Sequence, residues 1–153
     1  STVARHLSRI SGRPLLDTDD RIQAVRGRTI PELFATDGEA AFRKIETEVL
    51  REATKRCGTI IATGGGVVTR AANMRELAAR GLIVHIDRPL ALIHETIDYN
   101  ARPLLAGGRE ALDTLYRRRA PLYTQYADIT LDNAGSPGRA VETLLARIKE
   151  MGS

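Results

Sequence analysis

Two carboxylates follow a short apolar run near the start of the chain. Residues 14–16 indicate a buried strand, and Asp17 and Asp19 come directly after it, separated by one threonine. One carboxylate can hold a hydrated Mg²⁺, which prefers hard oxygen ligands, and the other can orient a hydroxyl or accept its proton. The structural alternative is that an acid here only caps the next helix, a role that the pattern gives to Asp19 or Asp20. These residues alone leave both interpretations open.

Three consecutive glycines, Gly64, Gly65 and Gly66, follow a second apolar run at 59–63. Because glycine has no Cβ, its backbone can approach a ligand closely and present N–H groups to it. A tight turn between a strand and a helix is the alternative, but such a turn does not require three glycines. The triplet therefore favours a ligand contact.

Arg43 and Glu46 are three residues apart in the longest predicted helix, so they lie on the same helix face. An exposed ion pair is one interpretation, and spacing alone favours it. In the other, Glu46 holds the Arg43 guanidinium so that its two parallel N–H groups can bind a carboxylate.

A further arginine, Arg102, lies in a loop that carries proline and a glycine pair. A mobile loop with an arginine suggests a lid that closes over phosphates. Arg117, Arg118 and Arg119 form a run within a predicted helix, and helical geometry allows at most one or two of the three to point inward.

The remaining reactive side chains indicate no second site. His6, His85 and His94 share no metal-ligand spacing, and His85, inside an apolar strand, is expected to be a hydrogen-bonded core or edge residue. The single cysteine, Cys57, excludes a disulfide within the chain and is expected to be buried.

Short apolar runs alternate with helical patterns along the chain, which is typical of a parallel sheet covered by helices on both faces. Strands are predicted at 14–19, 59–63, 82–87 and 129–131, and helices at 1–10, 20–25, from 29, 37–56, 71–80, 89–99, 110–127 (interrupted at Pro121) and 137–151. In such folds ligands bind beyond the carboxyl ends of the strands, where the two aspartates and the glycine triplet fall.

Composition fits one soluble domain: of 153 residues, 42% are hydrophobic and 27% are charged. No apolar run approaches the roughly 20 residues that span a bilayer, so we expect no membrane association. The net charge of +4 arises from basic residues scattered among acids, which argues against nucleic-acid binding. A lone cysteine fits a reducing compartment, and the cytoplasm is the default location.

Taken in order, seven segments resemble the shikimate kinase family. Any one of them is weakly specific, but seven in the family's order and spacing are highly specific. The segments are Ser1–Val3, Asp17–Asp19, Leu33–Phe34 with Asp37–Glu39, Phe42–Arg43 with Glu46, Gly64–Gly66, Arg102–Leu105 and Arg119–Tyr123. The resemblance runs from Ser1 to about Met151 and implies an α/β, three-layer P-loop kinase fold with a five-stranded parallel sheet.

The resemblance also implies an activity, the transfer of the γ-phosphoryl group of ATP to the 3-hydroxyl of shikimate with Mg²⁺. By position, Asp19 is similar to the carboxylate that binds the shikimate hydroxyls and acts as base, and Arg102 to the lid arginine that reaches the transferring phosphate. The implied shikimate contacts are Asp19, Arg43, Gly64, Gly65, Gly66 and Arg119; the implied ATP contacts are Ser1, Thr2, Arg102 and Pro137; the implied Mg²⁺ ligands are Ser1 and Asp17.

The resemblance divides the single kinase domain, residues 1–153, into a substrate-binding region at about 19–56 and a lid at about 100–110. The glycine-rich phosphate loop and the first strand of the family would precede Ser1, so we expect that Ser1 is not the biological N-terminus and that further domains can lie upstream. The family's adenine-stacking arginine is replaced by Glu95, which cannot supply a cation–π contact.

A related kinase of the gluconate kinase type and a non-catalytic shikimate-binding domain are the alternative functions. We expect the protein to be a monomer.

Overall fold

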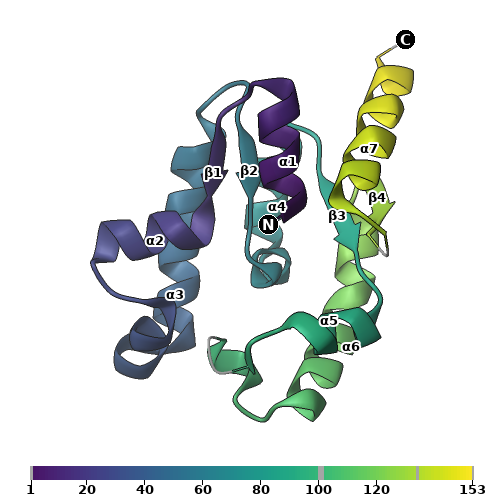
Figure 1. The fold of residues 1–153 in the computed structure, drawn as a ribbon. Coiled ribbons are helices and arrows are strands. Elements are labelled where there is room, and N and C mark those ends of the chain that lie inside the picture. The colour runs from purple at the N-terminus through teal and green to yellow at the C-terminus, as the bar shows by residue number, and fades with distance from the viewer. Residues whose placement is uncertain (1, 100–101, 134, 153) are drawn as a thin grey trace.

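The structure is a computed structural model that describes residues 2–99, 102–133 and 135–152. Short strands alternate with helices (Figure 1). In chain order the elements are α1 (Thr2–Ser11), β1 (Leu15–Asp17), α2 (Thr18–Arg26), α3 (Ile30–Thr54), β2 (Ile60–Ala62), η1 (Gly65–Thr69), α4 (Ala71–Arg80), β3 (Val84–Asp87), α5 (Leu90–Thr96), η3 (Pro103–Leu105), α6 (Arg109–Tyr126), β4 (Ile129–Asp132) and α7 (Pro137–Met151).

The strands form two parallel pairs. β1 pairs with β2 in the register Leu15–Ile60 to Asp17–Ala62, and β3 pairs with β4 in the register Val84–Ile129 to Asp87–Asp132. The parallel direction predicted from the sequence is therefore confirmed within each pair. The family's sheet has five strands, whereas the described residues hold four, and β2 and β3 are not paired with each other.

Helices cover both faces of the strands, as the layered pattern predicted. On one face, Val3 of α1 and Val141 of α7 pack against Ile86 of β3. On the other face, a second cluster joins α3, η1, α4 and α6 to the strands through Ile61 and to Ile83, just before β3. Val84 belongs to the α7 side with Ile86, so β3 alternates between the two faces in the way that a strand buried on both sides must.

A separate apolar cluster holds α2 against α3, apart from the core beneath the strands. Its buried members are Ile22, Leu33, Phe42, Ile45 and Val49. Because Phe42 and Ile45 face this cluster, their helix neighbours Arg43 and Glu46 turn toward the carboxyl ends of β1 and β2. The cluster thus fixes the side chains that the sequence marked as candidates.

Two predicted helix features are wrong. The residue that caps α2 is Asp17, not Asp19 or Asp20, because the strand ends two residues earlier than expected and its last residue supplies the cap. α6 also continues through Pro121, where an interruption was predicted. Proline removes one helical hydrogen bond, but the two residues after it, Leu122 and Tyr123, pack in the apolar cluster that includes η1 and hold the helix on that side of the proline.

Two side-chain predictions also fail. Cys57 is exposed, because it lies in the turn between α3 and β2 and not on either element. His85 has a buried Nδ1 with no hydrogen-bond partner among the described residues, where a hydrogen-bonded histidine was expected. Burial accordingly lowers the pKa of His85. Within the described ranges, no helix has the length and hydropathy needed to cross a bilayer.

α3 bends at Gly38, where the backbone has φ 85° and ψ 171°. This conformation is reached almost only by glycine. We expect Gly38→Ala to lower the free energy of unfolding by about 1–3 kcal/mol, measured by urea denaturation. Gly81→Ala is the matched control, because Gly81 has extended backbone and an added Cβ would meet no atom within 4 Å. Equal stability of the two variants would contradict the prediction.

Candidate active site

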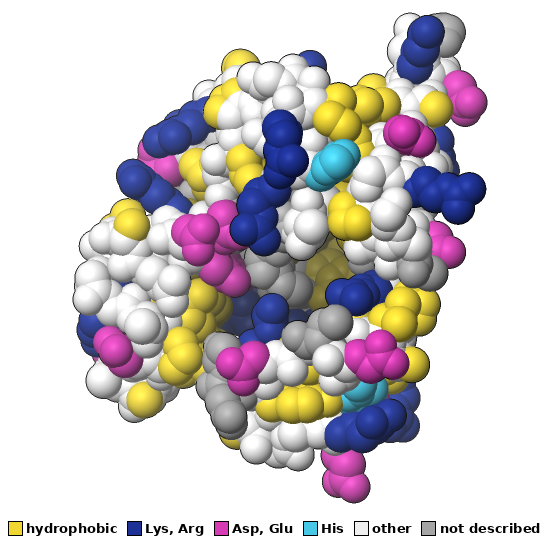
Figure 2. Space-filling view, in the orientation of Figure 1, with side chains coloured by type: hydrophobic (Ala, Val, Ile, Leu, Met, Phe, Trp, Pro, Cys, Tyr) yellow, Lys and Arg dark blue, Asp and Glu magenta, His cyan; other side chains and the backbone are white. Residues whose placement is uncertain are grey.

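The candidate residues gather beyond the carboxyl ends of β1 and β2. Asp17 ends β1, and Gly64 follows β2 after one further residue. Figure 2 shows a hollow in this face of the molecule, with basic side chains inside it and acidic side chains on its rim. This is the place at which a parallel sheet is expected to bind its ligand.

Asp17 fixes the position of Asp19. Its Oδ1 accepts hydrogen bonds from the backbone N–H groups of Asp19 (2.9 Å) and Asp20 (3.1 Å). The structural alternative considered for these acids, helix capping, is therefore what Asp17 does. Capping uses one carboxylate oxygen and places Asp19 in the first turn of α2, beside the glycine triplet.

Asp19 lies in an unusual electrostatic environment. A Cβ added at Gly64 would lie 3.2 Å from Asp19 Oδ1 and 3.5 Å from Glu46 Oε2, so both carboxylates lie over this one glycine. Burial, followed by the charges of Asp17 and Glu46, raises the pKa of Asp19 to about 6, against the opposing effect of Arg102 and Arg43. A carboxylate with a pKa near neutrality can take up a proton during a reaction.

Arg43 and Glu46 form an ion pair, with 2.8 Å between Arg43 Nη1 and Glu46 Oε1. The side chains are only 12% and 2% exposed, so the exposed pair that spacing favoured is wrong. Burying an ion pair costs desolvation free energy, which makes it a poor choice for stability alone. The guanidinium also lies 5.2 Å from the centre of the Phe42 ring, which fixes its plane.

The other two glycines are each approached by a different side chain. A Cβ at Gly66 would overlap the guanidinium of Arg43. A Cβ at Gly65 would lie 2.9 Å from Tyr123 Oη and 3.1 Å from Arg119 Nη1. The triplet therefore lets two guanidinium groups and two carboxylates approach the same stretch of backbone.

Tyr123 is a site residue that the sequence analysis named only as part of a motif. Its Oη donates a hydrogen bond to the Gly65 carbonyl (2.7 Å), and its ring stacks on His85 with 4.8 Å between centroids. Burial raises the pKa of Tyr123, although the nearby Arg119 opposes the shift. The four-residue spacing from Arg119 to Tyr123 was the available signal, since it puts both on one helix face.

Of the three consecutive arginines, only Arg119 turns inward. Arg117 and Arg118 are exposed and Arg119 is half-buried, which confirms the limit of one or two inward side chains. Arg119 Nε is buried and has no hydrogen-bond partner among the described residues. A buried unpaired donor on a cationic fork suits an anionic ligand.

Arg102 directly precedes η3. Its side chain is exposed, and its positive charge lowers the pKa of Asp19. The residues that the structure brings together are thus Asp19, Arg43, the glycine triplet, Arg102 and Arg119.

Of the residues assigned to ATP, Arg102 belongs to this cluster, whereas Thr2 and Pro137 belong to α1 and α7. Thr2 is exposed in the first turn of α1, and Pro137 is the first residue of α7, directly after its N-cap Ser136. Ser1 lies outside the described residues. Next to Pro137 is a cavity of about 220 Å³, lined by Asp132, Gly135, Ser136, Arg139, Ala140 and Thr143.

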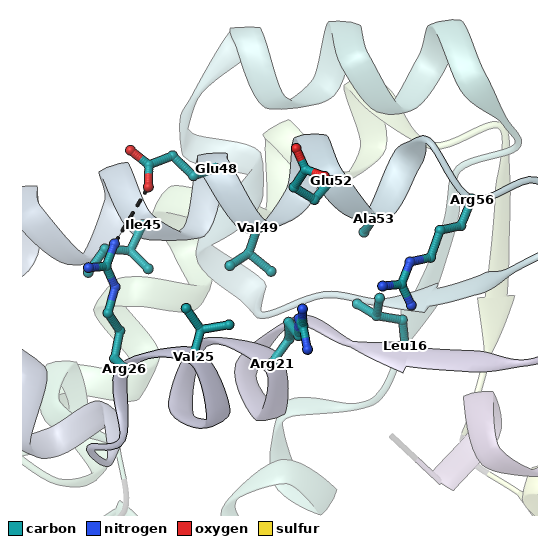
Figure 3. Close-up of a pocket in the computed structure, with 10 residues that line it drawn as sticks. All are labelled: Leu16, Arg21, Val25, Arg26, Ile45, Glu48, Val49, Glu52, Ala53 and Arg56. Carbon is teal, nitrogen blue, oxygen red and sulfur yellow. Dashed lines mark ion pairs between the residues drawn. The ribbon is translucent and has the colours of Figure 1, made fainter.

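A second cavity of about 220 Å³ lies between α2 and α3 and contains none of the candidate residues (Figure 3). Its floor is apolar and includes Val49, and its rim carries arginines and glutamates, among them the ion pair Arg26–Glu48 at 3.6 Å. No glycine and none of the candidate carboxylates is among the residues that line it.

A Mg²⁺ site would have to be built from few protein ligands: in the ranges that the structure covers, no group of three or more His, Cys, Asp or Glu side chains could hold an ion. Mg²⁺ commonly keeps most of its water and takes one or two carboxylates. Asp17 fits such a role, because only its Oδ1 is used in capping and carboxylate oxygen is a ligand that Mg²⁺ prefers.

Comparison with known proteins agrees with this arrangement. The family model described as shikimate kinase matches residues 1–149. The chain belongs to the shikimate kinase family. A shikimate kinase of Aromatoleum aromaticum is 41% identical over 145 residues, which are 92% of this chain and 83% of that protein.

Solved shikimate kinases share the fold. The enzyme of Acinetobacter baumannii, solved in complex with shikimate, superposes with a TM-score of 0.91 at 38% identity, covering 97% of this chain and 86% of that one. The enzyme of Aquifex aeolicus superposes with a TM-score of 0.87 at 33% identity, covering 99% and 90%. The expected P-loop kinase fold is thereby confirmed.

The crowding of carboxylates around Gly64 makes a prediction for this shikimate kinase family member. Glu46→Gln removes a negative charge that raises the pKa of Asp19, and it also frees the positive charge of Arg43, so the pKa of Asp19 should fall below about 6. Carboxyl ¹³C shifts of labelled aspartate, titrated by NMR and assigned with Asp19→Asn, measure it. Glu48→Gln, at an exposed position on the same helix, should leave the value unchanged.

Proposed function

We propose that the protein transfers the γ-phosphoryl group of ATP to the 3-hydroxyl of shikimate. One observation carries the proposal: a carboxylate with a pKa near 6 and two guanidinium groups meet over three consecutive glycines. Shikimate presents the complementary chemistry, since it has a carboxylate and hydroxyls on a small ring. Membership of the shikimate kinase family supports the same substrate.

Arg43 and Arg119 grip the substrate carboxylate. The Arg43 fork is oriented by Glu46, and the buried Nε of Arg119 lacks a partner that a carboxylate would supply. A planar guanidinium can donate two parallel hydrogen bonds to a carboxylate, which a lysine cannot do. The two arginines come from different helices, so they fix the orientation of the ring as well as its position.

Asp19 accepts the proton of the attacking hydroxyl. The hydroxyl oxygen forms a bond to the γ-phosphorus, the bond from that phosphorus to the bridging oxygen breaks, and ADP leaves. Arg102, whose charge acts on Asp19, stabilises the charge on the transferring group. Most of the rate enhancement in such a reaction comes from positioning and charge stabilisation.

ATP and Mg²⁺ occupy the remaining side of the site. Asp17 would hold the hydrated ion through its carboxylate, with Ser1 as the second ligand, and Mg²⁺ bound there would supply positive charge for the phosphates. Thr2 and Pro137 contact the nucleotide, and the cavity beside Pro137 provides space for it. Glu95 is exposed on α5, so the adenine is held without an arginine at that position.

The organisation of the domain follows from the same roles. Residues of about 19–56 form the substrate-binding region and those of about 100–110 the lid. We place the protein in the cytoplasm, in the pathway to aromatic amino acids, as a monomer.

The proposal is tested by ADP release with ATP and Mg²⁺ on the full chain. Shikimate should give turnover, whereas gluconate should give none, because its open chain does not match the spacing of two arginines set for a ring carboxylate. Calorimetry of shikimate binding accompanies the assay. Binding without turnover, also in a chain extended upstream of Ser1, would replace the kinase with a binding domain, and turnover with gluconate alone would reject the substrate.

Asp19 gives the reaction a pH dependence. Its ionised form is the base, so kcat/KM for shikimate should fall as pH decreases through about 6. Asp19→Asn should lower turnover by orders of magnitude and remove this limb, whereas Asp20→Asn, at the exposed neighbouring position, should keep it. The assay needs saturating ATP, because the terminal phosphate of ATP also titrates at a pH of about 6.

Protonation of Asp19 would not lower kcat/KM at low pH by unfolding the chain. The carboxyl of Asp19 binds its proton more tightly in the folded chain than in the unfolded chain, where its pKa has the ordinary value of 3.8. Its ionisation therefore destabilises the fold as pH rises from that value to about 6. Lower pH therefore favours folding through Asp19, although it also protonates Asp19 and so removes the base. A limb that persists in Asp19→Asn would show that another group is titrating.

A further inference from the structure

A cluster of three polar side chains lies outside the site described above. His94 of α5 is only 6% exposed, and its Nε2 lies 2.8 Å from Asp113 Oδ1 of α6. Its Nδ1 lies 2.5 Å from the hydroxyl of Tyr99. Both ring nitrogens of this buried histidine are therefore used, and neither partner contacts the substrate site.

The chemistry of the partners fixes the direction of the hydrogen bond to Asp113 and, in a neutral imidazole, of the hydrogen bond to Tyr99. A carboxylate only accepts, so His94 Nε2–H donates to Asp113. In that tautomer Nδ1 has a lone pair, and the Tyr99 O–H donates to it. A single side chain thus joins α5 and Tyr99 to α6, and the loss of one partner would leave a buried polar atom unsatisfied.

We propose that His94 is a positioning residue, which fixes Tyr99, and with it Arg102, on helix α6. The connection to Arg102 is direct, because the backbone N–H of Arg102 donates to the Tyr99 carbonyl (3.3 Å). Arg102 in turn accepts at its carbonyl from the N–H of Leu105 (2.9 Å), the last residue of η3. The inference rests on the proposed function, in which Arg102 acts on the transferring phosphoryl group.

Helix α6 is the common support that makes this anchoring useful. Asp113 and Arg119 are six residues apart on one rigid helix, a rise of about 9 Å. The same helix also holds Tyr123 against Gly65. Arg102 is therefore positioned relative to the helix that binds the substrate carboxylate, and its charge acts on Asp19.

The experiment uses Tyr99→Phe, which removes one hydroxyl and keeps the ring. Hydrogen exchange of the Arg102 and Leu105 amides, measured by mass spectrometry on the full chain without substrates, should become faster. Tyr116→Phe is the matched control, because Tyr116 is a half-buried tyrosine on α6 outside both the site and the cluster, and it should leave this exchange unchanged. Unchanged exchange in Tyr99→Phe would overturn the anchoring.

Kinetics test whether the anchoring serves Arg102. Tyr99→Phe should lower kcat roughly three- to tenfold, the equivalent of one hydrogen bond, while KM for shikimate stays the same, because the arginines that grip the substrate are untouched. His94→Gln, which retains a donor and an acceptor, should lose less than His94→Phe. In an Arg102→Lys background Tyr99→Phe should cause no further loss.

Each result has one meaning. An equal loss of kcat with and without Arg102→Lys would show a merely structural role and overturn the inference. A raised KM for shikimate with unchanged kcat would do so as well. If the unaltered protein gave no shikimate-dependent turnover, the proposed function would fail, and the exchange of the Arg102 amide would still decide whether His94 anchors that segment.

Discussion

The site depends on the absence of side chains at three consecutive positions. Gly64 lies beneath the carboxylates of Asp19 and Glu46, Gly65 beneath Arg119 and Tyr123, and Gly66 beneath Arg43. Asp19, Arg119, Tyr123 and Arg43 come within a distance at which a Cβ would collide or be compressed, whereas Glu46 would be in ordinary contact with it. Opposite charges can converge here only because the backbone is bare.

That convergence has an electrostatic consequence. Two of the carboxylates beside Asp19 are committed elsewhere, Asp17 to capping α2 and Glu46 to its ion pair with Arg43. Asp19 is the carboxylate left without a dedicated partner among the described residues, and burial beside two acids raises its pKa. Because its acidic neighbours interact with other groups, Asp19 is the carboxylate that can exchange a proton near neutral pH.

The sequence predicted most elements because their signals are local. α4 and α7 were predicted with the bounds that the structure has, since a capping glycine or proline and a steady apolar period define them. The errors are at positions that long-range contacts decide. α6 passes through Pro121 because residues beside it pack on η1, and spacing could not reveal that the Arg43–Glu46 pair is buried.

For the site, the types and order of the residues were enough to predict its members. They were not enough to predict which residues far apart in the chain would contact each other. Tyr123 and Gly65 form a hydrogen bond although they are 58 positions apart in the chain, and His94 and Asp113 form one although they are 19 positions apart. The residues next to each of these four side chains in the sequence do not indicate that the pair is in contact. Such contacts become visible only when packing brings α5, α6 and η1 together.

The two halves of the site belong to different strand pairs, which imposes a last constraint. Asp19 and Arg43 are held by the pair β1–β2 and its helices, whereas Arg119 and Arg102 lie on segments that follow β3. Because β2 and β3 are not paired in the described residues, helices join the halves: α1 contacts β1, β2 and α7, and α6 contacts η1. The hydrogen bond from Tyr123 to Gly65 crosses that boundary within the site itself. The spacing between the two arginines that grip the substrate is thus set by helix packing as well as by the sheet. Changes on the inner face of α6 should therefore alter substrate binding even where they touch none of the charged groups.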